Sequence, residues 1–485
     1  MRTSFMKKIA KLGIIILFAF PFSLWSDAIP LLTIEQVQKI GIDPDYPLDG
    51  NYILMQDIDA FQTRYWNNGR GFRPIGLREF TGVTGWVRSK FDYKYQPFEG
   101  VFDGNGHKIV NLYMNNLIGK GVLPSTKREF ESLISKLYPL GLFYEISQRG
   151  CVKNLILENI YIYGCFCDIC VVTRFNFGKI ENVHVWGELD GSGNFQNTCG
   201  LAVQNFGEIR NCSVTCEKFY AYNLGGLVHS NKGLIEHSFF SGCIFGTYGG
   251  GYIEGMGGLV SVNNDKGIIK DCFSDVQIRG GSVLGGLVGK NFGTISRSYS
   301  VVNAWGEQSV GGLIGINLGE VKECFATGEV RGMTKIGGLA GENTKAIFAN
   351  ENKNQVETYG ILEDCFFTGD VKGNDVIGGL VGVNDTSVCN CYCIGVLTKR
   401  EYIKILNGEL VGNNKGNVEN CVWELNSSGF ILPSTGVGKS PLEMKEKCTF
   451  VSLGWDFEKI WKIEEGNTYP YFTWLENYPN FLYIP

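Results

Sequence analysis

A short unit of small and apolar residues recurs nine times between Val171 and Asn414, and it predicts the architecture of the chain. Its clear copies read Gly-Leu-Val-Gly-x-Asn, as in Gly286–Asn291 and Gly379–Asn384. Successive copies lie 26 to 41 residues apart, and the longest step contains an insertion at Thr344–Tyr359. A repeat of this length indicates supersecondary units that stack to share one core. Because the units are rich in strand-forming residues and Gly, without helical periodicity, we expect an all-β fold: a single right-handed parallel β-helix of about 10 or 11 coils.

Each copy of the unit ends in an asparagine, which marks one position of the repeat. These positions are Asn176, Asn205, Asn231, Asn263, Asn291, Asn317, Asn343, Asn384 and Asn414. An amide side chain at the same turn of every coil can hydrogen-bond to its own backbone and to the amide of the next coil. We therefore expect a ladder of hydrogen-bonded asparagines within the stack.

Small side chains, mostly cysteine, recur seven residues after this asparagine, allowing for local insertions. The position is occupied by Cys212, Cys272, Cys324, Cys365, Cys391 and Cys421, with Val183, Ser238 and Ser298 in the remaining coils. A buried thiol packs as a small hydrophobe, so we expect a row of mostly free thiols. Adjacent coils nevertheless bring stacked cysteines within range of a disulfide. Cys170 and Cys199, which replace the first Gly of a Gly-Gly pair in neighbouring coils, are the candidate bonded pair.

An aromatic residue follows the small residue in six coils. The positions are Phe239, Phe273, Tyr299, Phe325, Phe366 and Tyr392. Successive strand residues face opposite sides of a sheet, so the small row and the aromatic row cannot both point inward unless the chain bends between them. Two interpretations stay open: the rings fill the core, or they form an exposed strip suited to sugar rings or to a partner surface. If the rings are core, the inserted loop Thr344–Tyr359 becomes the first candidate binding site.

The two ends of the chain differ from the repeats. Residues 1–28 have the pattern of a secretory signal: basic residues, the apolar run Leu12–Phe22, and the small-x-small site Ser26-Asp27-Ala28. Residues 29–140 are expected to form an N-terminal cap with irregular first coils, and residues 141–423 the regular coils. Residues 424–485 are expected to form a C-terminal cap, whose aromatic residues would seal the far end. No segment after the leader is long and apolar enough to span a membrane.

The net charge and the candidate catalytic residues restrict the possible classes of function. The formal charge is −5, and removing the leader takes away a net +3 and leaves about −8, which offers no basic footprint for nucleic acid. None of the four His lies in a His-Glu-x-x-His motif. The concentrated carboxylates Asp57, Asp59 and Asp103, with His107, would suit a polysaccharide lyase or hydrolase, although Asp in Asp-Gly-Asn-Gly more often forms a turn. We expect no catalytic, cofactor or metal site, and keep the polysaccharide enzyme as the alternative.

The unit Gly-Leu-Val-Gly-x-Asn-x-Gly-x-Ile, followed by Cys-Phe/Tyr-Ser/Ala, resembles the GLUG-motif repeat, as in Gly286–Ser300 and Gly312–Ala326. The resemblance implies an exported bacterial surface protein, because such repeats occur in adhesin-like proteins and in a region of IgA-cleaving metallopeptidases. It implies no catalytic residue set. We therefore expect an exported binding or adhesion protein, whose partner is a glycan or a ligand on a host or neighbouring cell, with a structural spacer as a second alternative.

Overall fold

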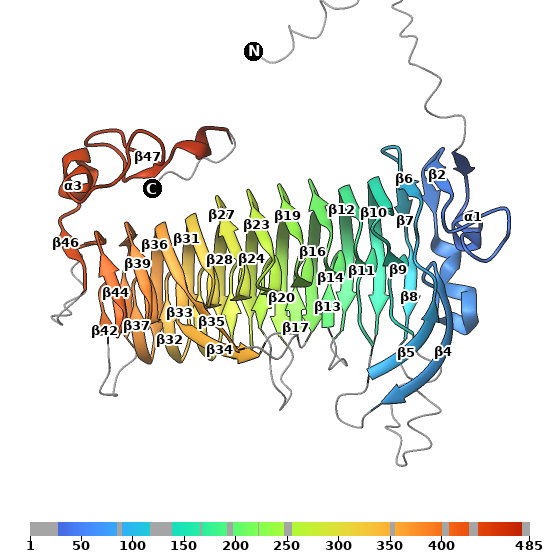
Figure 1. Cartoon of the computed structure of the whole chain (residues 1–485), viewed down its shortest axis with the longest axis horizontal. Helices are drawn as coiled ribbons and strands as arrows, with labels where there is room; N and C mark the ends of the chain where they lie inside the picture. Colours follow the sequence, from blue (N-terminus) through green and yellow to red (C-terminus); the bar gives the residue numbers. More distant parts are fainter. Residues whose placement is uncertain are drawn as a thin grey trace, which may run out of the picture.

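The computed structural model describes residues 28–84, 90–116, 138–164, 167–191, 197–221, 223–246, 255–349, 355–399, 407–425 and 435–477. The expected leader lies outside these residues, apart from Ala28. The described chain is a parallel β-helix, as the repeat predicts. Three parallel sheets run side by side along one axis (Figure 1).

Each regular coil crosses the three sheets in a fixed order, from the third sheet to the second and then to the long sheet. The long sheet contains 24 strands: β1 Ile29–Leu31, β2 Asn51–Leu54, β3 Ile58–Asp59, β6 Val101–Asp103, β7 Lys108–Val110, β8 Tyr113–Asn115, β10 Cys151–Tyr163, β12 Lys179–Asp190, β15 Glu208–Arg210, β16 Ser213–Ala221, β19 Leu234–Glu236, β20 Phe239–Gly246, β23 Ile268–Lys270, β24 Phe273–Arg279, β27 Thr294–Ser296, β28 Tyr299–Trp305, β31 Glu320–Arg331, β36 Ile361–Gly373, β39 Ser387–Cys389, β40 Tyr392–Ile394, β41 Leu397–Lys399, β44 Asn417–Glu419, β45 Val422–Glu424 and β46 Val437–Lys439. The second sheet contains ten: β9 Phe143–Ile146, β11 Thr173–Asn176, β14 Ala202–Asn205, β18 Val228–Asn231, β22 Val260–Asn263, β26 Val288–Asn291, β30 Ile314–Asn317, β33 Ala340–Asn343, β38 Val381–Asn384 and β43 Val411–Asn414. The third contains eight: β13 Asn197–Cys199, β17 Asn223–Gly225, β21 Met256–Gly257, β25 Leu284–Gly285, β29 Gln308–Gly311, β32 Thr334–Gly337, β37 Asp375–Gly378 and β42 Asn407–Gly408.

Three antiparallel pairs and five short helices complete the described structure. The pairs are β4 Leu77–Thr84 with β5 Lys90–Tyr95, β34 Lys345–Ala349 with β35 Gln355–Tyr359, and β47 Trp461–Lys462 with β48 Tyr471–Phe472. The helices are α1 Ile34–Lys39, η2 Phe61–Gly69, η3 Glu443–Lys445, α3 Lys447–Val451 and η4 Thr473–Asn477. At the N-terminal end, α1 begins at the capping box of Thr33 and Gln36, and its Ile34 and Val37 are buried against the first coil.

The nine repeat asparagines stack at the end of successive strands of the second sheet. Each of the first eight donates its Nδ2 to the Oδ1 of the asparagine in the next coil, at 2.7–2.9 Å, and the series ends at Asn414. The same Nδ2 also reaches a backbone carbonyl, as Asn317 does at Gly319 O, 3.0 Å away. All of these side chains before Asn414 are fully buried, so the ladder satisfies amides that would otherwise be costly to bury.

The glycines of the repeat allow the backbones of neighbouring coils to approach closely. A Cβ added at Gly286 would lie 2.0 Å from the carbonyl oxygen of Gly312 and 2.3 Å from the Ser300 hydroxyl. Only a residue without a side chain fits there, which explains the Gly at the start of each Gly-Leu step.

The small row faces the core and has a hydrogen-bonding role as well as a packing role. In each of these coils the residue before the small one adopts a left-handed turn, with φ between 45° and 54°; these residues are Asn182, Asn211, His237, Asp271, Arg297, Glu323, Asp364, Asn390 and Asn420. The thiol or hydroxyl that follows donates back across this turn, as Cys324 does to Lys322 O at 3.1 Å and Ser298 to Ser296 O at 2.8 Å. Cys and Ser therefore interchange because both are small donors. Burial raises the pKa of Cys272 to about 12, which keeps that thiol protonated.

The disulfide predicted between Cys170 and Cys199 is not formed, and both residues are free thiols in the structure. They are fully buried in adjacent coils and pack together with Val203. Each thiol points at a carbonyl of the preceding coil instead of at the other sulfur: Cys170 donates to Leu140 O at 3.1 Å, and Cys199 to Ile169 O at 3.7 Å.

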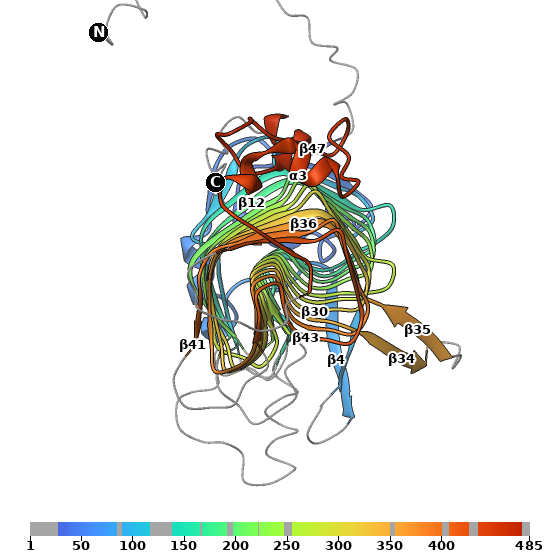
Figure 2. The same cartoon turned by 90° about the vertical axis from the view of Figure 1, so that its left-hand side faces the viewer.

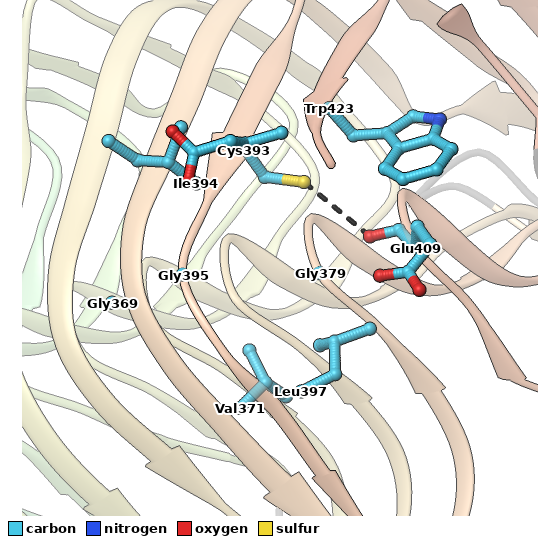
Figure 3. Close-up of a pocket in the computed structure, with 10 residues that line it drawn as sticks. Gly369, Val371, Gly379, Cys393, Ile394, Gly395, Leu397, Glu409 and Trp423 are labelled. Carbon is cyan, nitrogen blue, oxygen red and sulfur yellow. Dashed lines mark hydrogen bonds between the residues drawn. The ribbon is translucent and has the colours of Figure 1, made fainter. Parts of the chain in front are cut away.

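The far end of the core is closed by Trp423, not by the aromatic residues of the C-terminal cap as we expected. The Trp423 indole lies across the last coil beside Cys393 and Glu409 (Figure 3). The next strand, β46, lies over it so closely that a Cβ at Gly438 would be 2.7 Å from the ring. The space left between these residues is only about 10 Å³, which holds no organic ligand.

Replacing Asn317 by Ala should lower the free energy of unfolding by roughly 1–3 kcal/mol, because the amides of two neighbouring coils lose a buried partner. Equilibrium denaturation measures the change. The matched control is Asn303→Ala, since the Asn303 side chain is exposed and should change stability by less than about 0.5 kcal/mol. Equal effects at the two positions would contradict a stabilising ladder.

Candidate binding face

The carboxylates that the sequence offers for catalysis hold turns. Asp57 accepts from the backbone N–H of Lys108 at 3.1 Å and lies 3.2 Å from His107 Nδ1. The Lys108 hydrogen bond lowers the pKa of Asp57. Asp59 and Asp103 each accept from the backbone N–H two residues further on, at 2.9 and 2.8 Å. These contacts are those of turn-forming aspartates, and they lend the polysaccharide-enzyme alternative no support.

One described cluster has the composition of a metal site. Ligand atoms of Glu236, His237 and Asp271 lie within 4.8 Å of one another. Both carboxylates are already paired with arginines: Glu236 with Arg210, and Asp271 with Arg297 through two hydrogen bonds of 2.6 and 2.7 Å. A cation would have to displace both arginines, so we interpret this cluster as an ion-paired part of the left-handed turns.

The six predicted aromatic residues form one continuous stack along the long sheet, which we call the aromatic row. Neighbouring rings are nearly parallel, with centroids 4.7–5.1 Å apart and interplanar angles of 2–9°. The row lies in register on β20, β24, β28, β31, β36 and β40. Because the neighbouring small row points into the core, these rings point outward.

The outward-facing rings are largely covered by the chain itself. Residues 440–477, the C-terminal clamp, fold back over the outer face of the long sheet (Figures 1 and 2). The clamp and the row share one hydrophobic cluster, separate from the core of the coils; its clamp members include Met444, Phe450, Trp455, Trp461, Tyr471, Phe472, Trp474 and Leu475. Phe472 lies 5.3 Å from Phe366, and Trp474 lies 6.3 Å from Phe325.

Polar contacts attach the clamp to the coils at defined points. Tyr392 Oη donates to the carbonyl of Pro470 at 2.5 Å, and Trp455 Nε1 donates to Asn420 O at 2.8 Å. Trp461 Nε1 donates to Asp364 Oδ1 at 3.2 Å. Burial raises the pKa of Asp364, and the Trp461 hydrogen bond opposes that shift. The clamp therefore binds both the rings and the turns beside them.

This arrangement corrects both interpretations of the aromatic row. The rings are not inside the coils, and four of them are not an exposed strip, because Tyr299, Phe325, Phe366 and Tyr392 are all at most 8% exposed. Phe239 and Phe273, at the end nearer the N-terminus, are half-buried. The clamp residues expected to seal the end of the helix are thus the ones that cover the row.

A second outward-facing row, which the sequence reasoning missed, lies beside the first. It contains Tyr220, Phe245, Arg279, Trp305, Arg331 and Lys372, in register on successive coils; we call it the distal row. Tyr220 and Phe245 stack with centroids 5.2 Å apart, and Trp305 is 53% exposed. From Phe245 onward, each member follows the aromatic-row residue by six positions, and this constant offset was the signal available in the sequence.

The middle of the distal row combines rings with hydrogen-bonding groups. Arg279 lies between Phe245 and Trp305 in the register, and it has no ion-pair partner within the described part of the chain. Exposed amides of Gln277 and Asn303 lie two residues before Arg279 and Trp305 on the same face. These five residues form the open patch. Further along, Glu329 already pairs with Arg331 and Lys372.

Comparison with known proteins agrees with the architecture. A family model described as the GLUG motif matches residues 306–331, which include β29, β30 and all of β31. The chain carries GLUG repeats. The chain is similar to part of halomucin from Haloquadratum walsbyi, with 33% identity over 141 residues, which is 29% of this chain and 1% of halomucin. It is also similar to a protein of Evansella cellulosilytica named as a Gly-rich membrane protein, with 30% identity over 138 residues, 28% of this chain and 12% of that protein. The GLUG-repeat chain therefore matches only a small part of either relative.

Among the described residues, no helix of the GLUG-repeat chain is both long and apolar enough to cross a membrane.

The double substitution Tyr299→Ser and Phe325→Ser should release the clamp while the coils stay paired, because the inward-facing rows are unchanged. We expect amide exchange to accelerate in residues 444–475 and to stay slow in β24, β28 and β31, with a loss of roughly 3–5 kcal/mol of clamp packing for each ring. Hydrogen exchange measured by mass spectrometry reports both regions. Phe239→Ser, beyond the clamp, is the control. Fast exchange throughout the central coils would contradict this division.

Proposed function

We propose that this GLUG-repeat protein is an exported, non-catalytic rod that binds an extended glycan on the outer face of its long sheet. The observation that carries the proposal is the open patch of the distal row. There, Phe245, Arg279 and Trp305 project from consecutive coils of a rigid sheet that the clamp leaves uncovered.

The chemistry of the open patch suits a sugar chain. The C–H faces of sugar rings pack on aromatic side chains, and sugar hydroxyls need both donors and acceptors. Phe245 and Trp305 supply the ring surfaces, the Arg279 guanidinium supplies donors, and the amides of Gln277 and Asn303 supply both. Aromatic side chains on a sheet lose little conformational freedom on binding, so contact there is efficient.

The spacing of the open patch favours a chain over a single sugar. Phe245 and Trp305 are two coils apart, which is roughly 10 Å at the usual separation of parallel strands. A polymer lying along the axis of the rod would therefore place two of its sugar units on the two rings, with Arg279 between them.

Two observations support export to the cell surface. Residues 1–28 have the pattern of a secretory signal. One relative is named halomucin and the other is named as a membrane protein, and each is similar over only part of its length.

Trp305→Ala should weaken binding of an extended oligosaccharide at least tenfold, about 1.4 kcal/mol, because a stacked ring is lost. A glycan array selects the ligand, and calorimetry with a hexasaccharide measures the affinity. Trp186→Ala is the matched control, since Trp186 is a similarly exposed indole (56%) on the same sheet but outside the open patch. Both variants should unfold as the wild type does. Equal losses in the two variants, or no glycan ligand for the wild type, would favour a spacer.

Immunolabelling of intact cells tests the location. An antibody against the folded rod should stain unpermeabilised cells, and external protease should remove the signal. Staining that requires permeabilisation would contradict display at the surface.

A further inference from the structure

The N-terminal cap contains an open cleft of about 490 Å³, separate from the distal row. One wall is α1 with the turn that follows it, and its residues Glu35, Lys39 and Ile42 line the cleft. The other wall is the turn at the end of η2, which contributes Trp66 and Asn67. The volume lies within the range of pockets that bind small organic ligands.

The wall that carries Trp66 is held in an unusual backbone conformation. Asn67, Asn68 and Gly69 are consecutive left-handed residues, with φ of 53°, 58° and 79°. The turn is fixed by Asn67 Nδ2, which donates to Gly71 O at 2.7 Å. Gly71 packs so tightly that an added Cβ would lie 2.0 Å from Tyr113 O. Asn and Gly adopt the left-handed conformation more readily than other residues, so this turn holds the Trp66 wall in one position.

Hydrogen bonds also hold the opposite wall, α1, in place. Gln38 of α1 both donates to and accepts from the backbone of Arg73, each at 2.9 Å. Glu35 accepts a hydrogen bond from Gln62 on one of its two carboxylate oxygens. The cleft is therefore preformed, which lowers the entropy cost of binding.

We infer that this cleft binds one or two units of a saccharide, with a sugar ring stacked on Trp66. Each wall contributes an apolar side chain, Ile42 on one side and the half-buried Trp66 on the other, and Ile42 is 62% exposed. The rim presents a carboxylate (Glu35), an ammonium group (Lys39) and an amide (Asn67), so both donors and acceptors surround an apolar surface. A sugar ring carries the same combination: an apolar C–H face bordered by hydroxyls. A lipid chain or an apolar peptide would leave these polar groups unmatched.

Calorimetry of the full chain with four disaccharides (maltose, cellobiose, lactose and diacetylchitobiose) tests the inference. We expect millimolar or tighter binding of at least one of them, weakened about tenfold or more in Trp66→Ala and unchanged in Trp305→Ala. This pair of variants separates the cleft from the distal row, because the proposed function predicts the opposite pattern for long glycans. Binding that survives Trp66→Ala, or no binding by the wild type, would overturn the inference.

Two further measurements keep the test decisive. Trp66→Phe retains a ring and should lose less affinity than Trp66→Ala. Asn67→Gly is compatible with the left-handed φ and removes only the amide, so it should weaken binding severalfold without unfolding the cap, even if Trp66→Ala misfolds. Circular dichroism checks folding. Binding of an apolar peptide in place of every disaccharide would assign the cleft to a protein partner and reject the saccharide.

Discussion

In-register pairing between successive coils is the constraint on which the rest of this structure depends. When each coil lies directly on the last, residues at the same repeat position must stack, and every position becomes a row along the rod. A row of buried polar groups is stable only if its members satisfy one another. The asparagine ladder meets this condition from coil to coil. At its start, where β9 presents Ile146 instead of an asparagine, the Oδ1 of Asn176 finds no partner among the described residues.

The inward-facing residues of the coils could be predicted from the sequence, because the constraint on each of them comes from its immediate surroundings. The asparagine, the glycines and the small row each occupy one position whose side chain must fit a fixed space. The left-handed turns were missed, although they form an equally regular row. The restriction there acts on the backbone, and the side chains point outward, so residues as different as Asn182, Arg297 and Glu323 fill the same conformation. Their chemical variety hid the pattern.

The outward side was harder to predict, because what covers a row depends on distant residues. The alternation of residues along a strand showed that the small and aromatic rows face opposite sides of the sheet. It does not show whether a distant segment, such as the clamp with Phe450 and Trp461, will fold back across the sheet. The aromatic row and the clamp contain the same kind of side chain, and the contact between them is tertiary, about one hundred residues apart in sequence for the Trp461–Asp364 hydrogen bond. Similarly, the Cys170–Cys199 prediction rested on proximity, whereas the direction of each thiol is set by a nearby carbonyl.

The two outward rows consequently differ in what they offer. The clamp occupies most of the aromatic row with residues of the same chain, which stabilises this end of the rod. The distal row lies six residues further along the same strands, and there Trp305, Arg279 and the neighbouring amides of Gln277 and Asn303 stay exposed. A sheet that binds its own chain on one row and leaves the next row open combines stability and recognition on one face.

The hairpin β34–β35 shows how this architecture can change without cost to its core. It leaves the coil after Thr344 and returns at Gly360, and it projects sideways from the rod (Figure 2). The coils on either side remain paired as if the hairpin were absent: Asn343 is still opposite Asn384, and their amides are 2.9 Å apart. A segment can therefore be inserted at this turn without disturbing the pairing of the coils. Descendants of such a chain can acquire new appendages there while keeping an unaltered scaffold, and a foreign peptide grafted between Thr344 and Gly360 would be displayed in the same way.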